Sequence, residues 1–127
     1  MTVLVVALGL GGAAAGAKKK HKKTGKAWDS GVTLTHPLTN QFAGEVSSKL
    51  GACEASRVVT LFYTDPDTGQ TSPLSVQRTD GNGRYQMVLT RDAFFGTYQA
   101  QVAQRKIRAL KAPQTCRAAD TRAVVLQ

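Results

Sequence analysis

Residues 57–64, with the sequence RVVTLFYT, decide the fold because they combine a period of two with β-branched and aromatic side chains. Val59, Leu61 and Tyr63 fall on one side of such a strand and are expected to form its buried face. The next residues, 64–70 (TDPDTGQ), are typical of a hairpin loop, since Pro66 presets φ and a glycine near the end can adopt a left-handed conformation. The stretch therefore predicts a central β-strand followed by a hairpin.

Shorter runs with the same period surround this strand, and turn residues separate them. The expected additional strands are residues 32–35, 42–48, 74–77, 84–89, 97–102 and 121–126. Alternating runs that bury one face predict an all-β protein, an antiparallel two-sheet sandwich of about seven strands with an immunoglobulin-like architecture. In this pattern Tyr85 and Tyr98 are core residues and not a stacking platform for a sugar or base.

Residues 104–112, QRKIRALKA, fit two interpretations. Ala103, Ile107 and Leu110 recur at a helical spacing, which would give a short helix. The strict alternation before this segment and Pro113 directly after it favour a basic excursion between two strands instead.

Length and charge limit the classes of protein that this chain can be. Its 127 residues, 42% hydrophobic and 20% charged, suit one compact domain. The net charge is +9, but six of the 17 cationic side chains lie between Lys18 and Lys26. From Ala27 onward, 11 cationic and eight acidic side chains leave only +3. A uniformly basic nucleic-acid-binding domain is therefore disfavoured.

The amino-terminal residues indicate export. Residues 1–17 are uncharged and apolar and end in small residues, with A-x-A patterns that would release a mature chain beginning at Lys18 or Gly16, of which Lys18 is favoured. A charged n-region is missing, so either the start lies upstream or the α-amino group supplies that charge. An uncleaved anchor is the alternative, although about 24 Å of helix is short for a bilayer. We predict a signal peptide at 1–17, a basic disordered linker at 18–31 and the β-sandwich at 32–127.

The two cysteines, Cys53 and Cys116, are expected to form a disulfide, because their spacing and the lack of His or Cys companions do not suit a zinc site. The bridge would close a loop of about 64 residues and stabilise the fold by about 4 kcal/mol on the chain-entropy model. Two unrelated buried thiols are the alternative.

A set of short motifs resembles a known family. The residues that carry the resemblance are Phe42, Gly44, Val46, Ser47, Cys53, Arg57, Val59, Leu61, Thr79, Asp80, Gly83, Tyr85, Gly96, Tyr98, Ala100, Val102 and Cys116. Over residues 42–126 the chain resembles carboxypeptidase regulatory-like and prealbumin-like β-sandwich domains, and looks closest to small bacterial secreted forms with a lysine-rich stretch and one cysteine pair. The resemblance implies a noncatalytic stalk, accessory module or ligand-binding platform, and the single copy argues against a stalk.

The sequence contains no convincing catalytic or metal-binding pattern. Asp65, Asp67, Asp80 and Asn82 do not have the spacing of a calcium loop, so we interpret them as turn residues and predict no metal site and no cofactor. His36 precedes a proline and no G-x-S-x-G occurs, so no catalytic residue is predicted. The alternative function is a small hydrolase or ligand-processing enzyme on a transthyretin-like scaffold.

Clustered cations are the strongest candidate binding feature. The predicted polyanion-binding residues are Lys18, Lys19, Lys20, Lys22, Lys23, Lys26, Arg105, Lys106, Arg108 and Lys111. Such cations either form a solvated surface without a partner or attract an anionic cell-surface polymer or lipid outside the cytoplasmic membrane; an envelope protein is a further partner to consider. Neither nucleic acid nor a small-molecule substrate is expected. Trp28 has no core role in the pattern and is expected to pack over a sheet edge or to contact a partner.

Overall fold

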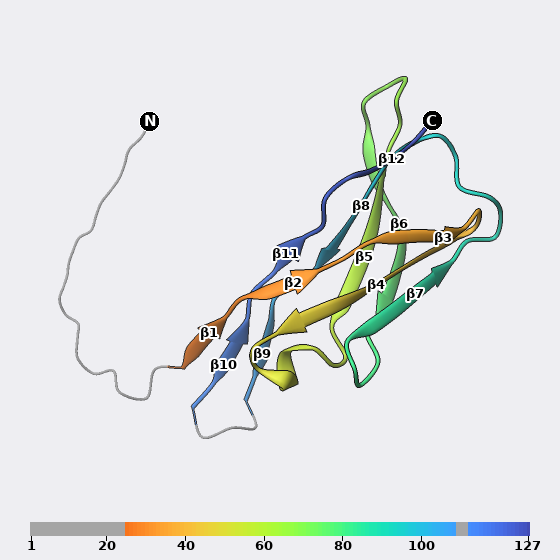
Figure 1. Ribbon diagram of the computed structural model, residues 1–127. Coiled ribbons are helices and arrows are strands. Elements are labelled where there is room, and N and C mark those ends of the chain that lie inside the picture. Colours follow the sequence, from red (N-terminus) through yellow and green to blue (C-terminus); the bar gives the residue numbers. More distant parts are fainter. Residues whose placement is uncertain (1–24, 109–111) are drawn as a thin grey trace, which may run out of the picture.

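The computed structural model describes residues 25–108 and 112–127, and they form an all-β protein with two larger sheets and one small sheet (Figure 1). One larger sheet has the order β11–β8–β5–β6, with β12 also paired to β8, and the other has the order β2–β4–β3, with β7 also paired to β4. The strands of the first are β5 (Val58–Thr64), β6 (Thr71–Arg78), β8 (Gly96–Val102), β11 (Ala119–Asp120) and β12 (Val124–Leu126). Those of the second are β2 (Ser30–Val32), β3 (Thr35–Leu38), β4 (Gln41–Ser48) and β7 (Arg84–Val88).

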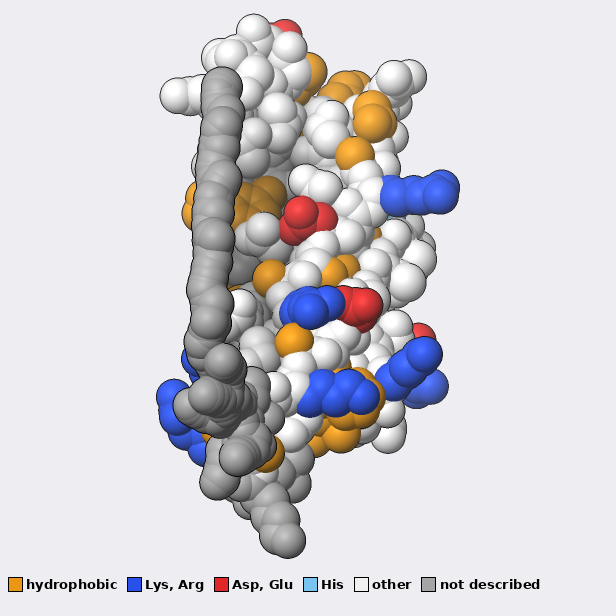
Figure 2. Space-filling model, turned by 90° about the vertical axis from the view of Figure 1, so that its left-hand side faces the viewer, with side chains coloured by type: hydrophobic (Ala, Val, Ile, Leu, Met, Phe, Trp, Pro, Cys, Tyr) orange, Lys and Arg blue, Asp and Glu red, His pale blue; other side chains and the backbone are white. Residues whose placement is uncertain are grey.

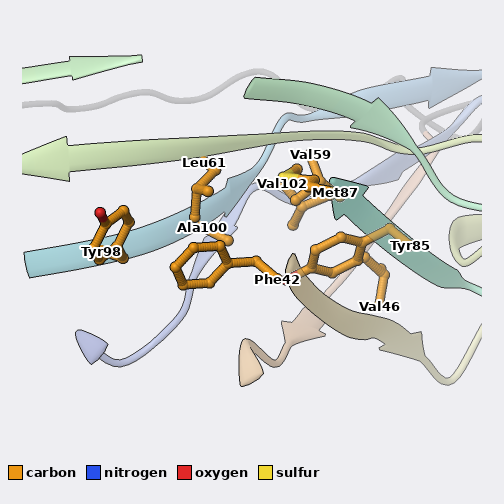
Figure 3. Close-up of a cluster of buried hydrophobic side chains, with 9 residues drawn as sticks. All are labelled: Phe42, Val46, Val59, Leu61, Tyr85, Met87, Tyr98, Ala100 and Val102. Atoms are coloured by element: carbon orange, nitrogen blue, oxygen red, sulfur yellow. The ribbon is translucent and has the colours of Figure 1, made fainter. Parts of the chain in front are cut away.

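The core lies between these two sheets, as expected for a β-sandwich (Figure 3). Its buried members are Phe42, Val46, Val59, Leu61, Tyr85, Met87, Tyr98, Ala100 and Val102. They alternate with less buried residues along β4, β5, β7 and β8, so each strand turns one face to the core. Burial of Tyr85 and Tyr98 confirms their predicted core role.

The predicted central strand is confirmed. β5 pairs in antiparallel register with β6 on one side and with β8 on the other, which places Val59 and Leu61 in the core. The predicted hairpin connects β5 to β6, and its turn closes with the amide of Gly69 donating to the carbonyl of Asp65 at 2.8 Å. Gly69 has φ of 75°, a conformation that suits glycine.

The first predicted strand is divided in two, and the last is shorter than predicted. Thr33 and Leu34 interrupt the run at 32–35, so β2 and β3 pair separately with β4. His36 and Pro37 were expected to end a strand, yet both lie within β3. β3 is an edge strand that pairs only with β4, and the register between them is irregular from Thr35 to Leu38. No strand pairs with the other edge of β3, so the amide that Pro37 lacks is not needed there. Of the predicted strand at 121–126, only Val124–Leu126 form a strand, β12, and the short strand β11 precedes the predicted run.

A third sheet of three short strands was not expected. β1 (Lys26–Trp28) pairs in parallel with β10 (Gln114–Cys116), and β10 pairs in antiparallel with β9 (Arg105–Ile107). The helical alternative for residues 104–112 is therefore wrong for the part that the structure describes, residues 104–108 and 112. The predicted basic excursion contains β9, which pairs in antiparallel with β10. The predicted linker boundary is also wrong, because ordered strands begin at Lys26 instead of Val32. A local pattern could not show this, since β1 finds its partner almost ninety residues away.

Candidate polyanion-binding surface

A disulfide anchors the small sheet to the body of the protein. Cys53 lies in the 3₁₀ turn η3 (Gly51–Cys53) and Cys116 ends β10, and the bond between them confirms the predicted pair. Both cysteines are fully buried and bonded to each other, so the alternative of two unrelated buried thiols is wrong. Disulfides form and persist in oxidising environments outside the cytosol.

Among the described residues, no helix is long and apolar enough to cross a membrane.

A buried arginine supports the same end of the sandwich. The guanidinium of Arg57 is fully buried at the start of β5 and donates to the carbonyl oxygens of Cys53, Ala103 and Arg117 at 2.6, 2.9 and 3.0 Å. The guanidinium also donates a hydrogen bond of 3.0 Å to the hydroxyl oxygen of Ser30. Arg57 thus ties together segments that lie far apart in the sequence. Its sequence neighbours, all typical of a strand, gave no sign of this role.

Burial lowers the pKa of Arg57 from its ordinary value, and the charge of Arg105 lowers it further. No carboxylate forms an ion pair with Arg57 among the described residues, where the ion pairs are Arg84–Glu45 and Arg117–Asp29. Carbonyl oxygens therefore stabilise its charge instead. The Nε atom has no partner in the described part of the chain.

The predicted cations divide between the two faces of the small sheet. Paired residues share a face, so Ala27, Thr115 and Lys106 form one row across β1, β10 and β9. Arg108 follows β9 and, by the alternation of an extended chain, lies on the side of Lys106. We call this side, formed by Ala27, Thr115, Lys106 and Arg108, the outer basic face. Lys26 and Arg105 belong to the opposite face.

Only some of the predicted cations are available for a ligand. The side chains of Lys106 and Arg108 are exposed and make no hydrogen bond or ion pair with the described residues. Arg105 is held in place because its guanidinium donates to the carbonyl of Ala55 at 2.7 Å. The predicted binding residues Lys18, Lys19, Lys20, Lys22, Lys23 and Lys111 lie outside the described residues.

The lysine-rich segment, residues 18–23, precedes β1 in the sequence. β1 is an edge strand of the small sheet and lies beside β10. The described part of the chain therefore begins at an edge of the sheet that carries the outer basic face.

The surface view agrees with a basic end (Figure 2). Lys and Arg side chains lie mainly in the lower half of this face, the height at which Figure 1 shows the small sheet, and acidic side chains lie directly beside some of them. Asp65 and Asp67 instead lie in the turn between β5 and β6, at the other end of β5 from Arg57. The charge is thus unevenly distributed along the sandwich.

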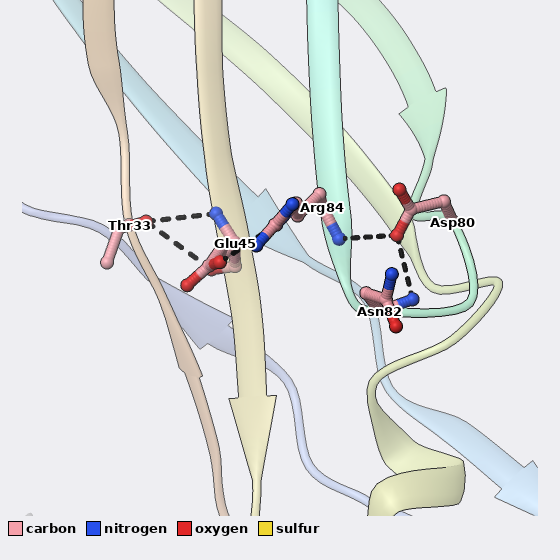
Figure 4. A network of polar contacts seen from close by, with 5 residues as sticks. All are labelled: Thr33, Glu45, Asp80, Asn82 and Arg84. Atoms are coloured by element: carbon pink, nitrogen blue, oxygen red, sulfur yellow. Dashed lines mark hydrogen bonds and ion pairs between the residues drawn. The ribbon is translucent and has the colours of Figure 1, made fainter.

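Acidic residues of the loops serve as turn residues. The Oδ1 atom of Asp80 accepts the amides of Asn82 and Arg84 at 2.8 and 3.0 Å, and Arg84 extends the network to Glu45 at 3.2 Å (Figure 4). Asp65 accepts the amide of Asp67 in the same way, at 2.8 Å. These contacts confirm the predicted turn role. The described residues contain no group of three or more His, Cys, Asp or Glu that could hold a metal ion.

Asp80 is expected to make the stability of the fold depend on pH. The amides of Arg84 and Asn82 hold the pKa of its carboxyl below the ordinary value. A lowered pKa in the folded state stabilises the protein above the unfolded pKa of about 3.9, and this stabilisation is lost as pH falls through the folded value. Asp80→Asn keeps the oxygen acceptor but cannot ionise, so its Tm should fall less than that of the wild type between pH 5 and pH 2. Circular dichroism measures the Tm of both proteins, and an equal fall in the two Tm values would contradict this assignment.

An apolar groove lies apart from the basic end. It has a volume of about 280 Å³ and is lined mainly by Tyr63, Leu74, Val88, Phe94 and Tyr98. The hydroxyls of Tyr63 and Tyr98 donate to the carbonyls of Phe95 and Phe94 at 2.8 and 2.7 Å, which fixes the loop beside the groove. Leu74 is exposed because β6 is an edge strand with an irregular register at this point. Sequence alternation alone could not reveal that this side is uncovered.

Comparison with known proteins does not assign the chain to a family: no family model, no curated protein and no solved structure matches it.

Proposed function

We propose that this protein is an exported, noncatalytic binding domain that associates with anionic polymers of the cell envelope through its outer basic face and the lysine-rich segment before β1. The observation that carries the proposal is the exposure of Lys106 and Arg108, without acidic partners among the described residues, on the small sheet. The first strand of that sheet, β1, follows the lysine-rich segment in the sequence. The disulfide supports the export part of the proposal. The resemblance to carboxypeptidase regulatory-like domains is consistent with a binding role and stays a prediction.

Several features favour an extended ligand over a small one. Lys106 lies on the edge strand β9 beside two small residues of the same row, Thr115 and then Ala27, and neither Lys106 nor Arg108 lines the apolar groove described above. The lysine-rich segment adds charges along the chain, so a polymer with repeated charges could contact both at once. Each contact would contribute about 1 kcal/mol near a charged surface and would be screened within about 8 Å at physiological salt.

The one histidine among the described residues has a structural role. The Nδ1 atom of His36 is hydrogen-bonded to the carbonyl of Gln41 at 2.9 Å, and its ring stacks on Phe42 at 4.5 Å between centroids. No Ser or Cys nucleophile among the described residues is hydrogen-bonded to it. We therefore base the proposal on binding and not on the hydrolase alternative.

The proposal predicts salt-sensitive binding to a simple polyanion. We expect the purified protein to bind poly-glutamate in calorimetric titrations at 20 mM NaCl and to lose most of that affinity at 300 mM. The double variant Lys106→Gln/Arg108→Gln should bind at least about tenfold more weakly, because two cations near the polymer are lost.

The matched control is Arg78→Gln/Arg122→Gln, which removes the same charge outside the small sheet. Arg78 ends β6, and Arg122 lies in the connection between β11 and β12. Its affinity should stay within about twofold of the wild type. Equal losses in the two double variants would show that net charge alone, and not the outer basic face, determines binding.

A further inference from the structure

Trp28 is the one tryptophan of the chain, and it lies outside the core. It ends β1 on the face opposite the outer basic face, in register with Cys116. Its indole N–H donates to the Oε1 atom of Gln114 at 2.6 Å, and Gln114 is the β10 residue that pairs with Lys26. The indole is therefore held in one orientation while remaining only partly buried.

A notch lies beside this ring. It has a volume of about 270 Å³ and is lined by Lys26, Ala27, Trp28, Asp29 and Lys49, and we call it the Trp28 notch. The volume is just below the range of about 300–1,000 Å³ that is usual for ligand sites, which suits a single ring-sized unit. Lys49 comes from the turn after β4, so two segments distant in sequence build the notch.

The charge of the notch is positive. Lys26 and Lys49 are exposed, and neither forms an ion pair within residues 25–108 and 112–127. The one acidic residue of the lining, Asp29, is already paired with Arg117 at 2.7 Å. The Nζ atom of Lys26 lies 4.2 Å from the centroid of the Trp28 ring, so this exposed ammonium rests over one face of the indole.

We infer that the Trp28 notch binds an acidic sugar unit of the polymer. A sugar ring presents an apolar C–H face that can pack on an aromatic ring, and Trp offers the largest such surface. The flexible Lys26 can swing from the ring to the carboxylate or phosphate of that unit, and Lys49 provides a second cation. A purely electrostatic surface would not need an oriented indole in the same notch as two lysines. The inference rests on the proposed function and specifies its ligand as an anionic polysaccharide instead of a lipid or polypeptide.

The single tryptophan makes this site directly observable. We expect polygalacturonate, a polymer of carboxylate sugars, to change the fluorescence of Trp28, whereas poly-glutamate of matched charge should bind without that change. Phosphorylated dextran tests whether the anionic group can be a phosphate, and unmodified dextran should have no effect because it lacks charge.

Variants then separate sugar recognition from charge. Trp28→Leu should weaken polygalacturonate binding at least fivefold in calorimetric titrations and leave poly-glutamate binding unchanged. Lys49→Gln, which retains the fluorescent ring, should weaken polygalacturonate binding and reduce the fluorescence change. The fluorescence of the wild type does not depend on whether Trp28→Leu folds.

Failure of this inference can be distinguished from failure of the proposed function. If both polymers bind equally well to the wild type and Trp28→Leu, and Trp28 fluorescence does not respond, the sugar site is wrong and the polyanion-binding role stands. If neither polymer binds at low salt, both are overturned. Binding of neutral dextran would also overturn the inference, because the two lysines would then have no role.

Discussion

Replacing Cys53 and Cys116 together by alanine is expected to lower the free energy of unfolding by about 4 kcal/mol. The bridge joins residues 63 positions apart, and on the chain-entropy model a loop of that length removes much of the freedom of the unfolded chain. Domains of this size are stable by about 5–15 kcal/mol, so the loss would be a large part of the total. Urea denaturation, followed through the fluorescence of Trp28, measures it.

Chemical reduction of the wild type provides the control. The reduced protein should denature at nearly the same urea concentration as the double alanine variant, because both lack the cross-link. A loss of less than about 1 kcal/mol in both would mean that the bridge contributes little to a fold already held by its other contacts.

Replacing Arg57 by methionine is expected to cost about 3 kcal/mol. Methionine fills much of the same space but donates no hydrogen bond, so the carbonyls of Cys53, Ala103 and Arg117 lose this partner in a buried site. Arg57→Lys should also destabilise the protein, because an ammonium is a compact charge that cannot span the separated acceptors of a guanidinium. The measurement is again the free energy of unfolding in urea.

Arg122→Met is the matched control for the arginine. Arg122 is exposed in the connection between β11 and β12, and its loss should change stability by no more than about 0.5 kcal/mol. If Arg57→Met were equally mild, the buried guanidinium would contribute no net stability to the fold.

Arg57 and the disulfide connect the same parts of the chain, so their effects should be coupled. The guanidinium bonds the carbonyls of Cys53, a bridge residue, and of Arg117, which follows the other bridge residue. Sites that share partners are rarely additive. The cost of Arg57→Met measured with the bridge intact should therefore differ from the cost measured in the double alanine variant.

Local patterns were sufficient to predict the main strands. The alternation in residues 57–64 identifies β5, and the turns at Gly69 and Asp80 follow from residue types that favour left-handed or Asx conformations. These features depend on neighbours in the sequence, which is why they could be predicted. The cysteine pairing followed because the chain offers just two cysteines.

The candidate site depended on contacts between distant segments. The ten predicted cations form two clusters in sequence, but the register of β1, β10 and β9 places Lys106 and Arg108 on one face and Lys26 on the other. The notch around Trp28 exists because the turn after β4 brings Lys49 beside β1. Neither arrangement has a local signal, because a period of two says which residues share a face but not what lies opposite it.

The sequence by itself thus determined the β class, the central strand, the turns and the concentration of positive charge. Tertiary structure alone decided that residues 26–28 become a strand, that Arg57 becomes a buried link, and which cations remain exposed for a partner. The physical reason is that propensity and alternation act between neighbours, whereas burial, register and charge pairing are set by segments that meet only after the chain has folded.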